Sequence, residues 1–212
     1  MPFIEEVKEF LFKNNFINKD WNALNILPQN ASTVGSIDLK FFNEKDEKNS
    51  SFFEKIKNNE FELIYLLGSD NIQITKKNEF VIYQGSHGDK GAEIADIILP
   101  SPAYTEQNGM FINLEGRVQE CRKASYPTGQ AIEDWKIFNS IMKELKNEKL
   151  FRNYDDLKKM ALDQIINFSG LDSLPSKNFK NNNKINSKYF DETIIVNEID
   201  YYFTNSIARS SK

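Results

Sequence analysis

Three short apolar runs in the middle of the chain constrain its fold more than any other feature. They occupy residues 61–67, 80–83 and 94–99, and each is closed by a glycine or a proline. Such runs are typical of parallel strands that are buried on both faces of a sheet. The intervals of about a dozen residues are just long enough for minimal crossovers between parallel strands. We therefore predict an α/β fold with a partial doubly wound (Rossmann-like), mostly parallel sheet flanked by helices.

Helical spacing surrounds these runs and dominates the second half of the chain. Apolar periodicity predicts helices over residues 2–12, 51–58, 133–145 and 154–168, and a shorter helix from Pro28 to Gly35. Gly170 is expected to end the last of them. Because the pattern turns helical from Pro127, we predict an α/β domain over residues 1–126 and a helical extension over residues 127–212.

The last forty residues have a different composition. Residues 173–188 are rich in Asn and Lys and contain a proline, which favours a linker or a disordered loop. Residues 189–199 alternate enough to predict a strand. The aromatic cluster of residues 201–203 is then expected to be exposed or to dock on a partner.

Composition excludes several classes of function. The net charge of −4 argues against nucleic-acid binding, which requires a basic surface. The single cysteine, Cys121, excludes an intramolecular disulfide and an iron–sulfur cluster, which takes about four thiolates. The single histidine, His87, excludes the usual histidine-rich metal sites. No apolar run approaches the roughly 20 residues of a membrane-spanning helix, and no targeting peptide is visible.

A glycine-rich loop, residues 85–91, follows the second apolar run and contains His87 and Lys90. Doubly wound sheets bind ligands at the carboxyl ends of their strands, so this loop is a candidate cofactor or anion site. The alternative is a tight connection in which glycines permit positive φ. We favour the tight connection because the spacing does not match Gly-x-Gly-x-x-Gly.

The dipeptide Asn108-Gly109 predicts a hairpin turn, with Glu106 before it and Glu115 and Arg117 after it. A carboxylate pair held in a dry pocket could perform acid–base chemistry. More often a Glu and an Arg two residues apart on a strand form a structural ion pair, and this is the interpretation we favour.

Three further residues carry weaker signals. Glu93 and Asp96 lie near the third run, where surface solvation or helix capping explains them. The basic residues that follow Cys121 would lower the pKa of its thiol. Without a partner other than a distant His87, a nucleophilic role is disfavoured. We assign no catalytic, cofactor-binding or metal-binding residue to this chain.

A series of segments resembles one protein family, in the family's order. They include residues 87–119 and also residues 20–27, 31–39, 66–70, 83–89, 95–100, 103–106, 133–137 and 203–209. Together they resemble the molybdopterin oxidoreductase-like domain of the 75 kDa (G-type) subunit of respiratory complex I. The resemblance covers most of this chain but only the C-terminal part of that subunit.

The resemblance implies a non-catalytic structural portion of NADH:ubiquinone oxidoreductase in the peripheral arm. The iron–sulfur clusters would lie on the N-terminal portion of the subunit, which would be a partner together with other peripheral-arm subunits. In molybdenum-containing relatives, the regions matching residues 95–100 and 109–119 lie near the pterin dinucleotide, which the complex I branch is held to have lost. The implied location is the matrix side of the inner mitochondrial membrane or, alternatively, the cytoplasmic face of a bacterial inner membrane, without membrane insertion.

Two alternatives belong to other classes. The chain could be part of an active molybdopterin-dependent oxidoreductase, with the loop at 85–91 and the hairpin lining a pterin pocket. It could also be a small nucleotide-binding α/β domain. About three buried strands are few for a doubly wound sheet, so we also expect the isolated chain to be only marginally stable without its partner.

Overall fold

The computed structural model describes residues 2–18, 20–41, 52–165, 168–175 and 200–211. Its helices are α1 (Pro2–Lys13), α2 (Thr33–Asp38), α3 (Phe52–Lys57), α4 (Lys90–Glu93), α5 (Asp134–Lys146), α6 (Tyr154–Gln164) and α7 (Ser206–Ser210), with a 3-10 turn at Tyr202–Thr204. Its strands are β1 (Leu63–Leu67), β2 (Phe80–Gly85), β3 (Ile97–Pro100), β4 (Gly109–Ile112) and β5 (Val118–Cys121). The described part is therefore an α/β structure, as predicted.

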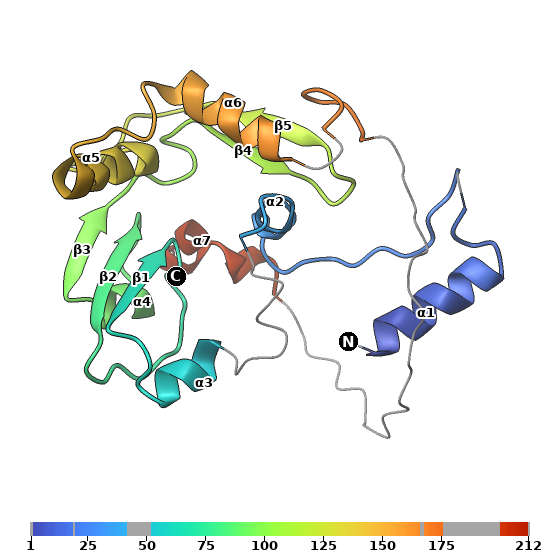
Figure 1. Cartoon of the computed structure of the whole chain (residues 1–212), viewed down its shortest axis with the longest axis horizontal. Coiled ribbons are helices and arrows are strands. Elements are labelled where there is room, and N and C mark those ends of the chain that lie inside the picture. Colours follow the sequence, from blue (N-terminus) through green and yellow to red (C-terminus); the bar gives the residue numbers. More distant parts are fainter. Residues whose placement is uncertain (1, 19, 42–51, 166–167, 176–199, 212) are drawn as a thin grey trace.

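The three apolar runs form one parallel sheet in the order β1-β2-β3 (Figure 1). Leu63 pairs with Phe80 at the start of β1, and Ile82 pairs with Ile97 at the start of β3. Only the second connection contains a helix, the short α4, while residues 68–79 join β1 to β2 without one. The prediction of parallel strands is confirmed.

One face of this sheet carries the apolar core. Alternate residues of β1 and β2 point to it and are at most 4% exposed: Ile64, Leu66, Val81 and Tyr83. Ile56 of α3 completes the cluster, and Ile72, Ile74, Ala92 and Ile94 pack against it. The core is therefore closed by α3, by the β1–β2 connection and by the α4 region.

Helix α5 lies against the opposite face. Its Phe138 ring stacks on Tyr65 of β1, with 5.7 Å between the ring centroids. Gln84 of β2 is fully buried, accepts a hydrogen bond from the Tyr65 hydroxyl, and donates from Nε2 to Asp134 Oδ1 over 2.6 Å. The other oxygen of Asp134 accepts from Gln107 Nε2 over 3.0 Å. Gln84 thus connects the sheet to the first turn of α5.

The second sheet is an antiparallel hairpin, but its turn is not where the sequence predicted it. Gly109 begins β4 and pairs with Cys121, so Asn108-Gly109 lies at the open end of the hairpin. The turn is formed by residues 113–117, where Asn113 Oδ1 accepts the backbone N–H groups of Glu115 and Arg117. Gly116 supplies the positive φ of 84° that the turn requires.

Three predicted helix boundaries are wrong, both ends of α2 and the end of α6. The short helix α2 begins at Thr33 instead of Pro28, and Gly35 lies inside it instead of ending it. A Cβ at Gly35 would lie 3.8 Å from Ile112 Cγ1, an ordinary contact distance, so α2 lies beside the hairpin without requiring a glycine there. Helix α6 ends at Gln164, well before Gly170, because Ile165 has already adopted an extended backbone. The helices predicted at 2–12, 51–58 and 133–145 are confirmed within one residue at each boundary that the structure describes.

The C-terminal segment, residues 200–211, returns to the parallel sheet (Figure 1). Tyr201 and Tyr202 are exposed, as expected of this aromatic cluster. The following helix α7 was not predicted; Asn205 caps it by accepting the backbone N–H of Ala208. The predicted strand at 189–199 and most of the predicted linker lie outside the described residues.

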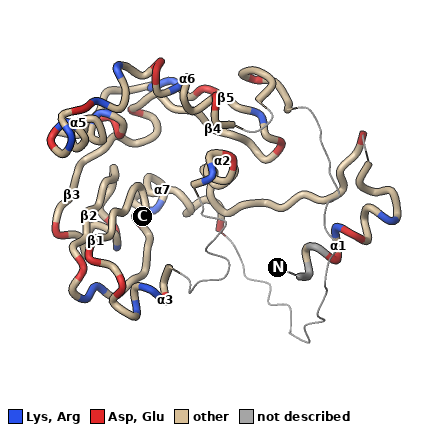
Figure 2. Tube along the Cα trace, viewed as in Figure 1, with Lys and Arg blue, Asp and Glu red and all other residues tan. Residues whose placement is uncertain are grey.

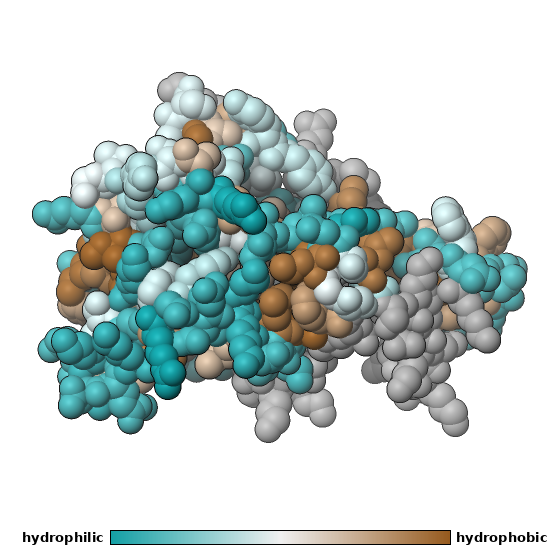
Figure 3. Space-filling view, turned by 90° about the horizontal axis from the view of Figure 1, so that it is seen from above, coloured by the Kyte–Doolittle hydropathy of each residue, from teal (hydrophilic) through white to brown (hydrophobic). Residues whose placement is uncertain are grey.

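Apolar side chains remain at the surface in several places. Figure 3 shows them gathered in separate patches on a face that is otherwise hydrophilic. On the parallel sheet they include Leu63, Phe80 and Ile97, which are 54%, 44% and 44% exposed. Within the described ranges, no helix combines the length and the apolar character needed to cross a bilayer.

The core cluster predicts a large effect of truncation at its centre. Because Val81 has no exposed surface, Val81→Ala should lower the free energy of unfolding by about 2 kcal/mol, through lost burial and a residual cavity. Urea denaturation measures this change. Leu145→Ala, on a side chain that is 74% exposed, is the control and should cost less than about 0.5 kcal/mol. Equal effects of the two substitutions would contradict the assignment of the core.

The Gln84 network predicts a second destabilisation of a different kind. Gln84→Leu keeps the volume but leaves the Tyr65 hydroxyl and one Asp134 oxygen without their partner. We expect a loss of about 2 kcal/mol in unfolding free energy, the cost of unsatisfied polar groups. The exposed Gln73→Leu should be neutral. A Gln84→Leu chain as stable as the parent would show that the network contributes nothing.

Candidate functional site

The carboxyl ends of β1 and β2 form the edge at which doubly wound sheets usually bind ligands. Two loops border it: residues 68–71 follow β1, and residues 86–89 follow β2. Each loop presents one half-buried carboxylate, Asp70 and Asp89. Arg209 of α7 pairs with both carboxylates. Figure 2 shows a basic position on α7, beside the parallel sheet. We call this region the carboxyl edge.

In the glycine-rich loop at 85–91, Gly85 and Gly91 allow close approach of neighbouring atoms and do not adopt positive φ, which corrects the prediction made from the sequence. Positive φ among the described glycines occurs at Gly68, Gly116, Gly129 and Gly170 only. A Cβ at Gly85 would lie 2.2 Å from the Tyr83 hydroxyl oxygen, and one at Gly91 would lie 2.6 Å from the Ser69 carbonyl oxygen. Gly91 also donates its backbone N–H to the Asp70 carbonyl oxygen over 3.0 Å. Gly91 therefore lets α4 pack tightly against the loop after β1, and Gly85 makes room for the Tyr83 side chain.

Arg209 of α7 lies between the two carboxylates. Its Nε donates to Asp89 Oδ2 over 3.1 Å, and its Nη1 donates to the Phe203 carbonyl oxygen over 2.9 Å. Its Nη2 lies 2.7 Å from Asp70 Oδ2, an ion-pair distance. The geometry there is not that of a hydrogen bond, and Nη2 is otherwise buried without a hydrogen-bond partner among the described residues. The guanidinium thus joins both loops to the C-terminal segment.

Ionisation at the carboxyl edge follows from these contacts. The backbone N–H of Lys90, and then the Arg209 side chain, lower the pKa of Asp89. Burial, together with the charges of Asp70 and Asp89, raises the pKa of Tyr83 to about 12, and the Arg209 charge opposes this shift. The Tyr83 hydroxyl donates to the His87 carbonyl oxygen over 2.7 Å. Tyr83 is therefore a neutral hydrogen-bond donor and is not poised as a base near neutral pH.

The other residues considered from the sequence near this edge have structural contacts. The His87 ring lies 2.9 Å from the Ser86 hydroxyl, and Lys90 is exposed. Asp96 accepts the backbone N–H of Val81 over 2.8 Å and pairs with Lys76, and these contacts lower its pKa. Glu93 is exposed in the single turn of α4. Of these residues, His87 and Lys90 take part in the edge, and they do so through their backbone groups.

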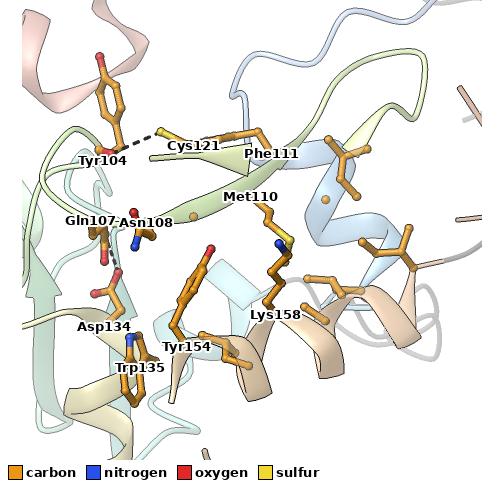
Figure 4. Close-up of a pocket in the computed structure, with 17 residues that line it drawn as sticks. Tyr104, Gln107, Asn108, Met110, Phe111, Cys121, Asp134, Trp135, Tyr154 and Lys158 are labelled. Atoms are coloured by element: carbon orange, nitrogen blue, oxygen red, sulfur yellow. Dashed lines mark hydrogen bonds between the residues drawn. The ribbon is translucent and has the colours of Figure 1, made fainter. Parts of the chain in front are cut away.

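A separate apolar cavity of about 300 Å³ lies between α2, the β4–β5 hairpin and the helices α5 and α6. Figure 4 shows Tyr154 and Lys158 on α6 pointing toward the hairpin residue Met110. Two polar groups at its wall are already engaged: Lys158 pairs with Glu120, and Asp134 accepts from two amides. Burial and the Glu120 charge raise the pKa of Tyr154. The cavity is therefore mainly apolar, with Cys121, Tyr154 and Lys158 at its wall, and we assign no reaction to it.

The hairpin residues considered from the sequence are not brought together as a reactive pair. Glu106 accepts the backbone N–H of Ala103 over 3.0 Å. Arg117 donates to the Asp172 carbonyl oxygen over 2.8 Å and lies with Glu115 in the turn, so the predicted strand ion pair is replaced by this contact. Cys121 Sγ lies 3.8 Å from the Tyr104 carbonyl oxygen. These contacts are structural.

The carboxyl edge was partly predictable, and its main residue was not. The glycine-rich loop identified the place, but Arg209 is separated from Asp89 by 120 positions. A phosphate-bearing cofactor needs N–H groups or cations here. Instead, Asp89 occupies the N-terminus of α4 and accepts the N–H of Lys90. The charges present do not fit a phosphate group. Among the described residues, no group of three or more His, Cys, Asp or Glu gathers to hold a metal ion.

Comparison with known proteins identifies relatives over nearly the whole chain. The chain is 36% identical to the NADH-ubiquinone oxidoreductase 75 kDa subunit of Reclinomonas americana, covering 99% of this chain and 30% of that protein. It is 39% identical to the G-type NADH-quinone oxidoreductase subunit of Rickettsia typhi, covering 94% and 28%. It is 38% identical to the mitochondrial NADH-ubiquinone oxidoreductase 78 kDa subunit of Candida albicans, covering 97% and 29%.

The chain therefore spans less than a third of the length of these relatives. Its residues 2–144 also match the family described as Molybdopterin oxidoreductase. The chain belongs to the molybdopterin oxidoreductase family and is homologous to the 75 kDa (G-type) subunit of complex I.

Proposed function

We propose that this chain is a non-catalytic structural portion of the 75 kDa subunit of NADH:ubiquinone oxidoreductase. It would sit in the peripheral arm and support electron transfer from NADH to quinone by holding the cluster-bearing portion in place. The observation that carries the proposal is the similarity over 94–99% of this chain to subunits named for that enzyme. The iron–sulfur clusters would belong to the N-terminal portion of the subunit, because the single cysteine of this chain cannot ligate a cluster.

We also propose that this chain binds no molybdopterin cofactor. Molybdopterin dinucleotides carry phosphate groups, and the carboxyl edge presents Asp70 and Asp89 where such groups would need N–H donors. Arg209 is the cation closest to them, and both carboxylates already engage it. This charge arrangement supports a chain that keeps the fold of a cofactor enzyme without its cofactor, and no reaction step is assigned to it.

The sheet supports the need for a partner chain. A doubly wound layer usually has five or more strands, whereas the described sheet has three. Leu63 and Phe80 pair across β1 and β2, and both are exposed on the face that also carries Ile97. Exposed apolar area of this kind marks interaction surfaces. We propose that the upstream portion of the subunit completes a Rossmann-like layer here, and that peripheral-arm subunits are further partners.

The remaining details follow from the same proposal. We keep the division into an α/β domain at 1–126 and a helical extension at 127–212 as a proposal; the family match runs to residue 144 and so includes the start of the extension. The location would be the matrix side of the inner mitochondrial membrane or the cytoplasmic face of a bacterial inner membrane, without insertion into the bilayer and without nucleic acid.

Association with the upstream portion tests the proposal. The chain, co-expressed with the residues that precede the matching region in a G-type relative, should co-purify with them. Phe80→Asp places a charge on the exposed apolar face, so it should weaken the complex at least roughly tenfold, measured by calorimetric titration. Leu145→Asp, a matched change at a 74% exposed position of α5, should leave the affinity unchanged.

Two outcomes would contradict the proposal. One is a chain that runs as a free monomer and never purifies with complex I subunits. The other is stoichiometric molybdenum or tungsten in the purified assembly, which would favour an active molybdopterin-dependent oxidoreductase.

A further inference from the structure

The C-terminal segment brings an arginine to the place where a doubly wound sheet usually holds its ligand. Asn205 caps α7, Ala208 of the same helix is buried, and Arg209 then reaches the loops after β1 and β2. Its side-chain pairing with Asp70 and Asp89 is mostly shielded from solvent, with 17% of the Arg209 and Asp70 side chains exposed. The segment is thus docked on the carboxyl edge through a specific charged contact.

The shape of this contact suits a guanidinium group. Two of its nitrogens donate hydrogen bonds in different directions, Nε to Asp89 Oδ2 and Nη1 to the Phe203 carbonyl oxygen. The third nitrogen, Nη2, lies at ion-pair distance from Asp70 Oδ2. A planar guanidinium carries five N–H donors in a fixed fork, whereas an ammonium is a compact point charge. A lysine at this position would not reach the same acceptors together. The recognition is therefore of the group and not only of its charge.

A second, independent observation concerns which proteins share this segment. The match to the molybdopterin oxidoreductase family ends at residue 144. The similarity to the 75 kDa subunit of Reclinomonas americana covers 99% of the chain and so includes nearly all of residues 145–212. The arginine-bearing segment thus lies outside the part matched to the wider family and inside the part matched to complex I subunits.

We infer that the carboxyl edge is a guanidinium-binding site whose ligand is Arg209 of the chain's own C-terminal helix. The arginine takes the place that phosphate groups occupy in cofactor-binding sheets. By joining Asp70 to Asp89 it holds the loop after β1 against α4, where Gly91 donates to the Asp70 carbonyl oxygen. This inference goes beyond the proposed function, because it concerns how the edge is closed and not what the chain assembles with.

Hydrogen exchange of the full chain tests it. Arg209→Ala should speed amide exchange in residues 68–71 and 86–91 by about tenfold or more, because the loops lose their common partner. Arg152→Ala removes the same charge at an exposed position and should leave these amides unchanged. Asp89→Asn should reproduce the effect of Arg209→Ala in part, because Asn still caps a helix but carries no charge.

Chemical rescue separates group recognition from charge. Methylguanidinium added to the Arg209→Ala chain should restore slow exchange, and methylammonium at the same concentration should not. Arg209→Lys keeps the positive charge and serves as the second variant if Arg209→Ala fails to fold. Its loop amides should exchange faster than those of the parent chain.

Three results would overturn the inference. They are parent-like exchange in Arg209→Ala or Arg209→Lys, equal rescue by the two cations, and saturable binding of inorganic pyrophosphate at this edge of the parent chain. Because the readout is the loops themselves, the outcome is independent of whether the chain joins a larger assembly.

Discussion

The buried Gln84 amide is the contact on which the arrangement of the rest depends. It lies in the central strand β2, has no exposed surface, and bridges Tyr65 of β1 to Asp134 of α5. Asp134 in turn holds Gln107, at the start of the hairpin. Burying a polar group in this position lowers the stability of the fold unless each of its hydrogen-bond partners is present. The sheet, α5 and the hairpin are therefore fixed relative to one another by one small network, and the cavity between them follows from that placement.

The parallel sheet could be predicted because its signal is local. Residues 61–67, 80–83 and 94–99 are apolar and are closed by Gly or Pro, as expected of parallel strands. The expected burial on both faces is wrong for the described structure, because Leu63, Phe80 and Ile97 are exposed on one face. Helices α1, α3 and α5 also follow from periodicity. The predicted hairpin turn was misplaced because Asn108-Gly109 is a strong turn signal. The actual turn is formed by Asn113, whose side chain accepts two backbone N–H groups, and by Gly116, and dipeptide statistics do not register such a side-chain contact.

The main residue of the carboxyl edge could not be predicted for a different reason. Nothing in the spacing of Asp70 and Asp89 indicates that a residue 120 positions beyond Asp89 returns to them. The glycines at 85 and 91 correctly predicted a tight loop, but they allow close approach of neighbouring atoms and do not adopt positive φ. Such close approach depends on tertiary packing and so could not be predicted from the sequence. In this chain the carboxyl edge holds two carboxylates paired with an arginine, so function must be argued from the site and not from the fold.

The central claim is that the chain acts through structure and not through chemistry. The most direct test measures two quantities on complex I assembled with this chain or with its Gln84→Leu variant: the amount of complete complex, and the rate of NADH oxidation per complete complex. Our account predicts that the variant lowers the amount of complex and leaves the rate per complex within about twofold of the parent. A normal amount of complex with a rate per complex reduced about tenfold or more would contradict it, because such a loss is the signature of a residue that acts in the reaction.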